Sequence, residues 1–191
     1  MLRTKKIDTG LEIVISEETA SKLAKFEVLI NKVAQALTLK VFYDYSKIII
    51  SFIFKKNANM NPYSCYVLEK FKANHSGFTS DDVFLLDDKA WILKSVEYCE
   101  KVVKEAKTNG RHIVTYPLFL ALIVLAVDDT DKEKNLSTIC DFARMLEVSN
   151  EEMLDLVNIV KYVFQNESYE KPKTHSINAD FANVLTIYRR S

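Results

Sequence analysis

The sequence predicts an all-α globular bundle of about seven to eight helices. Hydrophobic residues make up 48% of the 191 residues, which is ample to fill a core. Apolar side chains recur at steps of three and four in one segment after another, the period of an amphipathic helix. Only three glycines and three prolines occur, and nearly all of them stand where such a segment should begin or end.

Residues 1–75 are expected to form an N-terminal helical region that is partly β or wholly helical. The segment LEIVI at 11–15 suits either a short strand or an extended arm. A helix follows, with Ser16 or Thr19 as its cap. Its apolar stripe consists of Leu23, Phe26, Ile30, Val33 and Leu37.

Residues 39–55 carry two conflicting signals. Val41, Tyr45, Ile48 and Phe52 continue the helical spacing, whereas the isoleucine run 48–50 and the aromatic residues suit a strand. We predict a helix, and a β-hairpin stays the alternative.

Proline, glycine and capping residues mark the next helices. Asn61 and Pro62 begin one helix, which should end before Gly77, and Thr79 with Asp82 has capping-box spacing for another. A helix over 88–109 then stops at Gly110. Its predicted buried face comprises Ile92, Val96, Cys99, Val103 and Ala106.

Residues 76–191 should form a C-terminal helical domain that packs with the first region into one compact unit. Its central helix starts near Pro117 and is apolar nearly all round, so it should be buried. Thr130 with Glu133 and Ser149 with Glu152 have the spacing of capping boxes. Apolar residues at helical spacing form three further stripes: Leu136, Ile139, Cys140, Ala143 and Leu146; Met153, Leu156, Val157, Val160 and Phe164; and Ile177, Phe181, Val184, Leu185 and Tyr188.

Charge, cysteine content and hydropathy exclude several classes of protein. Basic and acidic residues number 26 each, so the chain lacks the basic excess of a dedicated nucleic-acid binder. Cys65, Cys99 and Cys140 form no C-x-x-C pair and are interpreted as small buried hydrophobes, which favours the cytoplasm. The longest apolar stretches fall short of the ~20 residues that cross a bilayer.

Motifs of catalysis are absent from the sequence. Gly10, Gly77 and Gly110 are isolated, so neither a phosphate-binding loop nor a dinucleotide fingerprint can form. The chain also lacks a G-x-S-x-G elbow and an H-E-x-x-H helix. We therefore expect a protein that is not an enzyme and has no cofactor, unless a cation binds.

An acidic bend after the central apolar helix is the candidate cation site. Asp128, Asp129, Asp131 and Glu133 supply carboxylates of the kind that Ca²⁺ or Mg²⁺ prefers. The alternative is structural, because Asp131 and Glu133 would stand in the first turn of the next helix, where negative charge is stabilising. Only Asp128 and Asp129 have no structural role in that interpretation.

The same segment, AVDDTDKEKNLSTICDFARMLEVSNEE, resembles the tellurite-resistance TerB-like family over residues 115–165. Asp128 takes the place of the family aspartate, Asp129 replaces the usual glycine, and Glu147 replaces the glycine before Val-Ser. The resemblance implies an all-helical fold whose acidic turn is associated with divalent cations. The family usually has a second acidic turn, for which Asp87 and Asp88 are poorly fitting candidates here.

These observations favour a non-catalytic helical protein-interaction or adaptor module, TerB-like and associated with stress or membrane assemblies. The candidate partner-binding residues are Tyr43, Tyr45, Tyr63 and Tyr66, since tyrosine is favoured at interfaces. The alternative is that they cover the edge of the core. One alternative is a bacterial secretion-system adaptor, chaperone or small effector. A further alternative is a divalent-cation-binding protein or enzyme that uses the acidic bend. A homo-oligomer is compatible with the pattern.

Overall fold

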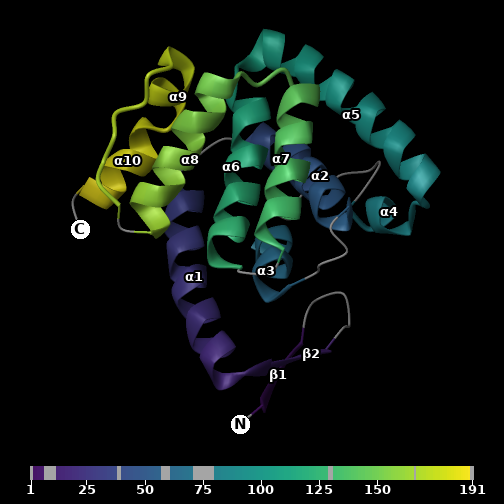
Figure 1. The fold of residues 1–191 in the computed structure, drawn as a ribbon, viewed down its shortest axis with the longest axis vertical. Coiled ribbons are helices and arrows are strands. Elements are labelled where there is room, and N and C mark those ends of the chain that lie inside the picture. Colours follow the sequence, from purple (N-terminus) through teal and green to yellow (C-terminus); the bar gives the residue numbers. More distant parts are fainter. Residues whose placement is uncertain are drawn as a thin grey trace.

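The computed structural model describes residues 2–6, 12–37, 40–56, 61–70, 80–128, 131–165 and 167–189. Within these ranges a two-stranded hairpin precedes ten helices (Figure 1). The strands are β1 (Leu2–Lys6) and β2 (Glu12–Ser16). The helices are α1 (Glu17–Ala36), α2 (Lys40–Lys56), α3 (Pro62–Lys70), α4 (Ser80–Leu85), α5 (Asp88–Asn109), α6 (His112–Val127), α7 (Lys132–Met145), α8 (Asn150–Phe164), α9 (His175–Asp180) and α10 (Ala182–Arg189). The predicted fold class is confirmed, and the short α4 and α9 raise the number of helices above seven to eight.

The N-terminal hairpin leads directly into α1. Its strands pair antiparallel, from Leu2 opposite Ser16 to Lys6 opposite Glu12, and lie at the foot of α1 (Figure 1). Ser16 Oγ accepts a hydrogen bond from the Thr19 amide at 3.1 Å, so Ser16 is the cap. The predicted α1 stripe is buried, from Leu23 through Leu37.

The ambiguous segment 39–55 is helical from Lys40 onward, as α2, while residue 39 lies outside the described residues. Every residue from Ile48 to Phe54 is buried, because α2 packs against α6 and also contacts α3, α4, α5 and α7. A helix enclosed on all sides can be apolar all round, which explains why its isoleucine run resembled a strand. Ser51 is accommodated because its hydroxyl donates to the Lys47 carbonyl at 2.7 Å.

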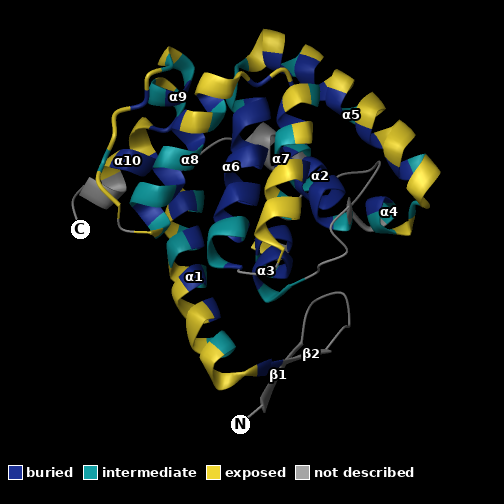
Figure 2. Cartoon of the chain, viewed as in Figure 1, coloured by how far each residue is buried: buried dark blue, intermediate teal, exposed yellow. Residues whose placement is uncertain are grey.

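Helix α6 is the centre of the molecule. Each residue from Ile113 to Val124 is buried, and α2, α5, α7 and α8 all pack against it. Figure 2 shows α6 dark along most of its length, with exposed residues confined to the outer faces of the surrounding helices. The predicted buried central helix is therefore confirmed.

The start of α6 differs from the prediction. The helix begins at His112, and Pro117 lies inside it. The chain turns at Gly110, whose φ of +116° favours glycine, and a Cβ there would lie 2.8 Å from His112 Nδ1. Amides of Val114 and Thr115 already bond to the Arg111 carbonyl, so the first turn forms before the proline.

The buried face of α5 is rotated relative to the prediction. Ile92 and Val96 are 54% and 42% exposed, whereas Trp91 is buried and its indole N–H donates to the Phe52 carbonyl at 3.1 Å. The buried residues are Trp91, Ser95, Cys99, Val102, Val103 and Ala106. Anchoring Trp91 against α2 turns its neighbour Ile92 outward.

The two predicted capping boxes around α7 and α8 have different outcomes. At α8, the Glu152 amide donates to Ser149 Oγ at 3.1 Å and the Ser149 amide donates to Glu152 Oε2 at 2.9 Å, which confirms the box. At α7, the N-cap residue is Asp131 and its side chain makes no capping hydrogen bond. Helix α7 thus starts at Lys132. Thr130 itself lies outside the described residues.

The C-terminal helices close the core. Ile177, Phe181, Val184 and Leu185 are buried as predicted, and α10 packs against α1 and α8. Helices from residues 1–75 and from residues 76–191 thus contribute to one buried cluster. Gly77, Thr79 and the side chain of Tyr188 lie outside the described part of the chain.

Candidate functional site

A groove of about 290 Å³ lies between α6, α7 and α8. It runs beside the first half of α7 and the second half of α8. Along α8, the step from Val157 to Gln165 is roughly 12 Å, or two helical turns, at 1.5 Å per residue. The apolar lining residues are Leu122, Leu125, Ala126, Leu136, Val157 and Val160.

Leu136 lines this groove, and the prediction that it lies on the buried face of α7 is wrong. The side chain is 41% exposed, because α7 directs Thr138, Ile139, Phe142 and Ala143 into the core instead. Leu136 therefore forms a wall of the groove, where apolar surface stays accessible.

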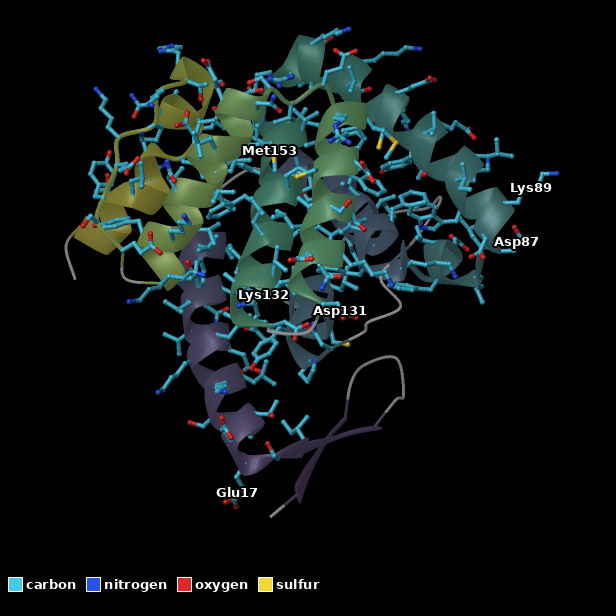
Figure 3. The ribbon with its side chains drawn as sticks, viewed as in Figure 1. Glu17, Asp87, Lys89, Asp131, Lys132 and Met153 are labelled. Atoms are coloured by element: carbon cyan, nitrogen blue, oxygen red, sulfur yellow. The ribbon has the colours of Figure 1, made fainter. Side chains whose placement is uncertain are left out.

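Polar residues surround one end of the groove. Lys132 and Glu133 come from the first turn of α7, Lys161 comes from the last turn of α8, and Gln165 is the C-cap of α8. Two lysines against one glutamate give this rim a positive balance. Figure 3 places Lys132 at the lower end of α7, beside Asp131.

A partly buried ion pair connects the start of α8 to the start of α6. Arg111 donates from Nε and Nη2 to the two Glu152 oxygens at 3.1 and 2.6 Å, and its Nη2 also donates to the Glu147 carbonyl. Burial by itself would raise the pKa of Glu152. Hydrogen bonds from Arg111, the Ser149 amide and Ser176 outweigh burial, so the pKa is lowered. Glu152 is therefore a charged structural group.

Asp155, one turn further along α8, holds the linker to α9. Its carboxylate accepts the amides of Lys173 and Thr174 at 3.0 and 2.8 Å and the Thr174 hydroxyl at 2.6 Å. Burial raises the pKa of Asp155, yet these hydrogen bonds and the Lys173 charge lower it overall. Both buried carboxylates of α8 are thus satisfied by the fold.

Three other groups have a raised pKa for a single main reason, burial. The Asp180 pKa is raised, although the nearby charges of His112 and Arg111 oppose the effect. Burial also raises the pKa of Tyr116, whose hydroxyl donates to the Asp180 carbonyl at 2.8 Å. The Cys99 thiol has a pKa raised to about 12, so it is protonated at neutral pH and is a poor nucleophile.

At the acidic bend, only Asp128 faces the interior among the described carboxylates. Asn61 Nδ2 donates to Asp128 Oδ2, while Asn61 Oδ1 caps α3 by accepting the Ser64 amide at 2.8 Å. A cavity of about 20 Å³ adjoins Asp128, Asn61 and Asn135, which is space for about one water molecule. Asp128 therefore joins the end of α6 to the start of α3.

The other predicted cation ligands do not join Asp128 in the described structure. Asp131 is exposed, with a left-handed φ of 47°, and Glu133 lies at the rim of the groove. Asp129 lies outside the described residues. Within the ranges described, no group of three His, Cys, Asp or Glu side chains could hold a metal ion. Because Asp129 is not among the described residues, the cation hypothesis stays a prediction.

Asp87, a candidate for the second acidic turn, caps α5, since its Oδ1 accepts the Ala90 amide at 2.7 Å.

The three candidate partner-binding tyrosines with described side chains do not form one exposed patch. Tyr63 is buried, with its ring 5.2 Å from that of Phe26, which corrects its assignment to a surface. The half-buried Tyr66 hydroxyl donates to Asn31 Oδ1 at 3.4 Å. Tyr45 is half-buried with its ring 6.5 Å from that of Tyr98, and the Tyr43 side chain lies outside the described structure. The three described tyrosines cover the core, the alternative that the sequence left open.

The sequence predicted neither the groove nor the Arg111–Glu152 pair. The pair joins residues 41 apart, and local spacing carries no signal for such a contact. The groove had one weak signal: Leu136, Val157 and Val160 all appeared in predicted stripes, but their relative placement depends on how α7 and α8 sit on α6.

The sequence analysis predicted cysteines outside any disulfide framework and no helix long enough to cross a membrane. Cys65, Cys99 and Cys140 are all free thiols. Among the described helices, even the strongly apolar α6, with 16 residues, falls short of what a membrane-spanning helix requires.

Comparison of the chain with protein-family models, curated proteins and solved structures finds no match.

Proposed function

We propose that this protein is a non-catalytic helical interaction module that binds an amphipathic helix of a partner protein in the groove between α6, α7 and α8. The observation that carries this proposal is the groove itself: about 290 Å³ of space with a mainly apolar lining. Apolar grooves between helices are a recurrent binding site for the apolar face of a partner helix.

The shape and charge of the groove define the chemistry of the partner helix. A length of roughly two turns accommodates apolar side chains at positions i, i+3 or i+4, and i+7. Lys132 and Lys161 at the rim favour acidic residues beside these anchors, with only Glu133 opposing them. The predicted ligand is therefore a short amphipathic helix with an acidic flank.

Binding rather than catalysis is supported by the roles of the described ionisable groups. The buried carboxylates of Glu152 and Asp155 are saturated by hydrogen bonds that hold the fold together. The Cys99 thiol is buried and protonated at neutral pH. None of these groups lines the groove.

A relationship to the TerB-like family is part of the same proposal. It is supported by the left-handed φ of 54° at Glu147, the position where the resemblance expects glycine. An adaptor role in a stress- or membrane-associated assembly in the cytoplasm is the function that this relationship suggests.

Titration followed by NMR tests the groove. The probe is a synthetic helical peptide with leucines at i, i+4 and i+7 and glutamates beside them, added to the ¹⁵N-labelled full chain. We expect amide shifts concentrated at Leu136, Val157 and Lys161. The Leu136→Asp variant should abolish the shifts, because it places a carboxylate in the apolar wall.

Three controls define the outcome. A peptide with serine in place of leucine should not bind, and one with lysine in place of glutamate should bind more weakly. Leu154→Asp changes a leucine of α8 that is 53% exposed and outside the groove, so it should bind normally. Failure of the leucine peptide to bind, or equal binding by Leu136→Asp, contradicts the proposal. Displacement of the peptide by decanoate would instead indicate an acyl-chain site.

A further inference from the structure

Helix α5 has an apolar outer face that the described part of the chain leaves exposed. Leu93 is 62% exposed, and Ile92 and Val96 lie beside it at 54% and 42%. Leu85, at the end of the adjoining α4, is 84% exposed. A local group of four large exposed aliphatic side chains is typical of an interaction surface, and Figure 2 shows exposed residues along this outer edge of α5.

The residues along this face have helix-pairing spacing. Lys89, Leu93, Val96 and Glu100 follow one another at steps of four, three and four, which is the period of a seam between two packed helices. All four are exposed. Figure 3 shows Lys89 at the outer end of α5, directed away from the bundle. We call these four residues the α5 seam.

The α5 seam is complementary to itself when reversed. Turning the helix end over end about a point between Lys94 and Ser95 exchanges Lys89 with Glu100 and Leu93 with Val96. In an antiparallel pair, each lysine therefore meets a glutamate and each aliphatic residue meets another. In a parallel pair, Lys89 would meet Lys89 and Glu100 would meet Glu100.

The two end charges have no partner within the described part of the chain. No ion pair forms at Lys89 or at Glu100 there, whereas the neighbouring Lys94 and Glu97 pair with each other at 2.9 Å. Lys89 and Glu100 thus remain available for a second molecule.

We propose that the protein forms a homodimer in which the α5 seams of two copies pack antiparallel across a two-fold axis. Such a contact uses the same patch on both copies. The seam extends roughly 16 Å along the helix, which makes a small interface, so the dimer dissociates on dilution. The α5 seam and the groove of the proposed function consist of different residues, so each can fail independently.

Sedimentation equilibrium on the full chain, from micromolar to near-millimolar concentration at low salt, tests the dimer. The wild-type chain should shift from the monomer to the dimer mass. Lys89→Glu alone and Glu100→Lys alone each place like charges together at both ends of the seam. Each should weaken self-association about tenfold or more.

Mixing the two variants tests whether the end charges of the seam meet across the dimer. In a mixed pair, the glutamate introduced at position 89 of one copy meets the lysine introduced at position 100 of the other. At the opposite end of the seam, the native Glu100 of the first copy meets the native Lys89 of the second. We therefore expect an equimolar mixture to dimerise more tightly than either variant alone, and the double variant Lys89→Glu/Glu100→Lys to recover wild-type association.

Two aliphatic variants separate the seam from general surface effects. Leu93→Asp should abolish the dimer, whereas Val28→Asp, at a 57% exposed position on α1, should leave it unchanged. Circular dichroism should show wild-type helicity for every variant, since the changed side chains are exposed. A wild-type chain that stays monomeric at all concentrations overturns the proposal, as does a dimer indifferent to Leu93→Asp or to the charge reversals.

Discussion

Among the individual residues, Glu147 carries the clearest local strain. Its φ of 54° places it in the left-handed region, where a side chain is unfavourable and glycine is not. The turn around it closes α7: the Val148 amide bonds to the Ala143 carbonyl at 2.9 Å, and the Glu147 amide bonds to the Arg144 carbonyl at 3.1 Å. This is the pattern in which helices commonly end with glycine at the left-handed position.

We expect Glu147→Gly to stabilise the protein by about 1 kcal/mol, because removing the side chain relieves the left-handed strain. The Glu147 carbonyl, which accepts Arg111 Nη2 at 3.0 Å, is retained. Urea unfolding of both proteins measures the difference. Glu147→Ala is the control, since it removes the exposed side chain but keeps the strain; equal effects of glycine and alanine would contradict this explanation.

Among the helices, α8 links parts of the chain that are distant in sequence. Glu152 binds Arg111 at the start of α6, and Asp155, on the next turn, binds the linker before α9. Both carboxylates belong to a helix that also packs apolar residues against α6. The position of α8 is thus set by charge on one side and by burial on the other.

These two carboxylates predict a pH dependence of stability. Their folded-state pKa values lie below the ordinary 4.5 and 3.8, so the charged forms favour the folded state. Their contribution is complete above those ordinary values and is lost as the pH falls through the lowered ones. At pH 7, Asp155→Asn should reduce the free energy of unfolding by about 1–3 kcal/mol.

Denaturant unfolding of wild type, Asp155→Asn and Glu152→Gln from pH 7 to pH 3 measures this contribution. The difference between each variant and wild type should be constant from pH 7 to 5 and shrink below pH 4. Asp180 has the opposite, raised pKa, to which the Glu152 charge contributes. Its titration therefore cancels in the comparison of Asp155→Asn with wild type but not in that of Glu152→Gln. A difference that stays constant to pH 3 would show that ionisation is not involved.

Across the molecule as a whole, the C-terminal helices complete a core that begins in the N-terminal region. Phe181 is fully buried, with its ring 4.8 Å from that of Phe119 and 5.0 Å from that of Tyr116. Helix α10 lies against α1 as well as α8. The two ends of the chain are therefore joined through one hydrophobic cluster.

Phe181→Ala should accordingly destabilise the entire protein by about 3–5 kcal/mol, as a large-to-small change in a core does. The loss should appear as a single shifted transition when thermal unfolding is followed by circular dichroism and by Trp91 fluorescence. Asn183→Ala, at an exposed position of α10, is the matched control and should change stability by no more than about 0.5 kcal/mol. Separate transitions for the two probes would contradict a shared core.

Predictions from the sequence succeeded where the signal is local. The Ser149–Glu152 box, the Ser16 cap and the end of α5 at Gly110 depend on residues within one turn of each other. Burial of α6 followed from a composition that no partly exposed helix could have. The helical state of residues 40–55 was predicted correctly, although only the packing around α2 distinguishes helix from hairpin there.

Predictions failed where a distant partner decides the outcome. Trp91 fixes the rotation of α5 through a hydrogen bond to Phe52, 39 residues earlier, and so leaves Ile92 and Val96 outside. Tyr63 has the composition of an interface residue but packs on Phe26. In both cases the local sequence pattern is compatible with more than one face of the helix being buried.

Local sequence is sufficient to specify which segments are helices, where most of them are capped and which helix is central, because these features depend on hydrogen bonds and periodicity within a few residues. Which side of each helix is left exposed depends instead on packing between helices. The groove beside Leu136 and the α5 seam exist because packing against α6 and α2 buries one face of a helix and leaves the other uncovered. Both proposed binding surfaces therefore depend on which helix face is buried, and contacts between residues far apart in the chain decide this.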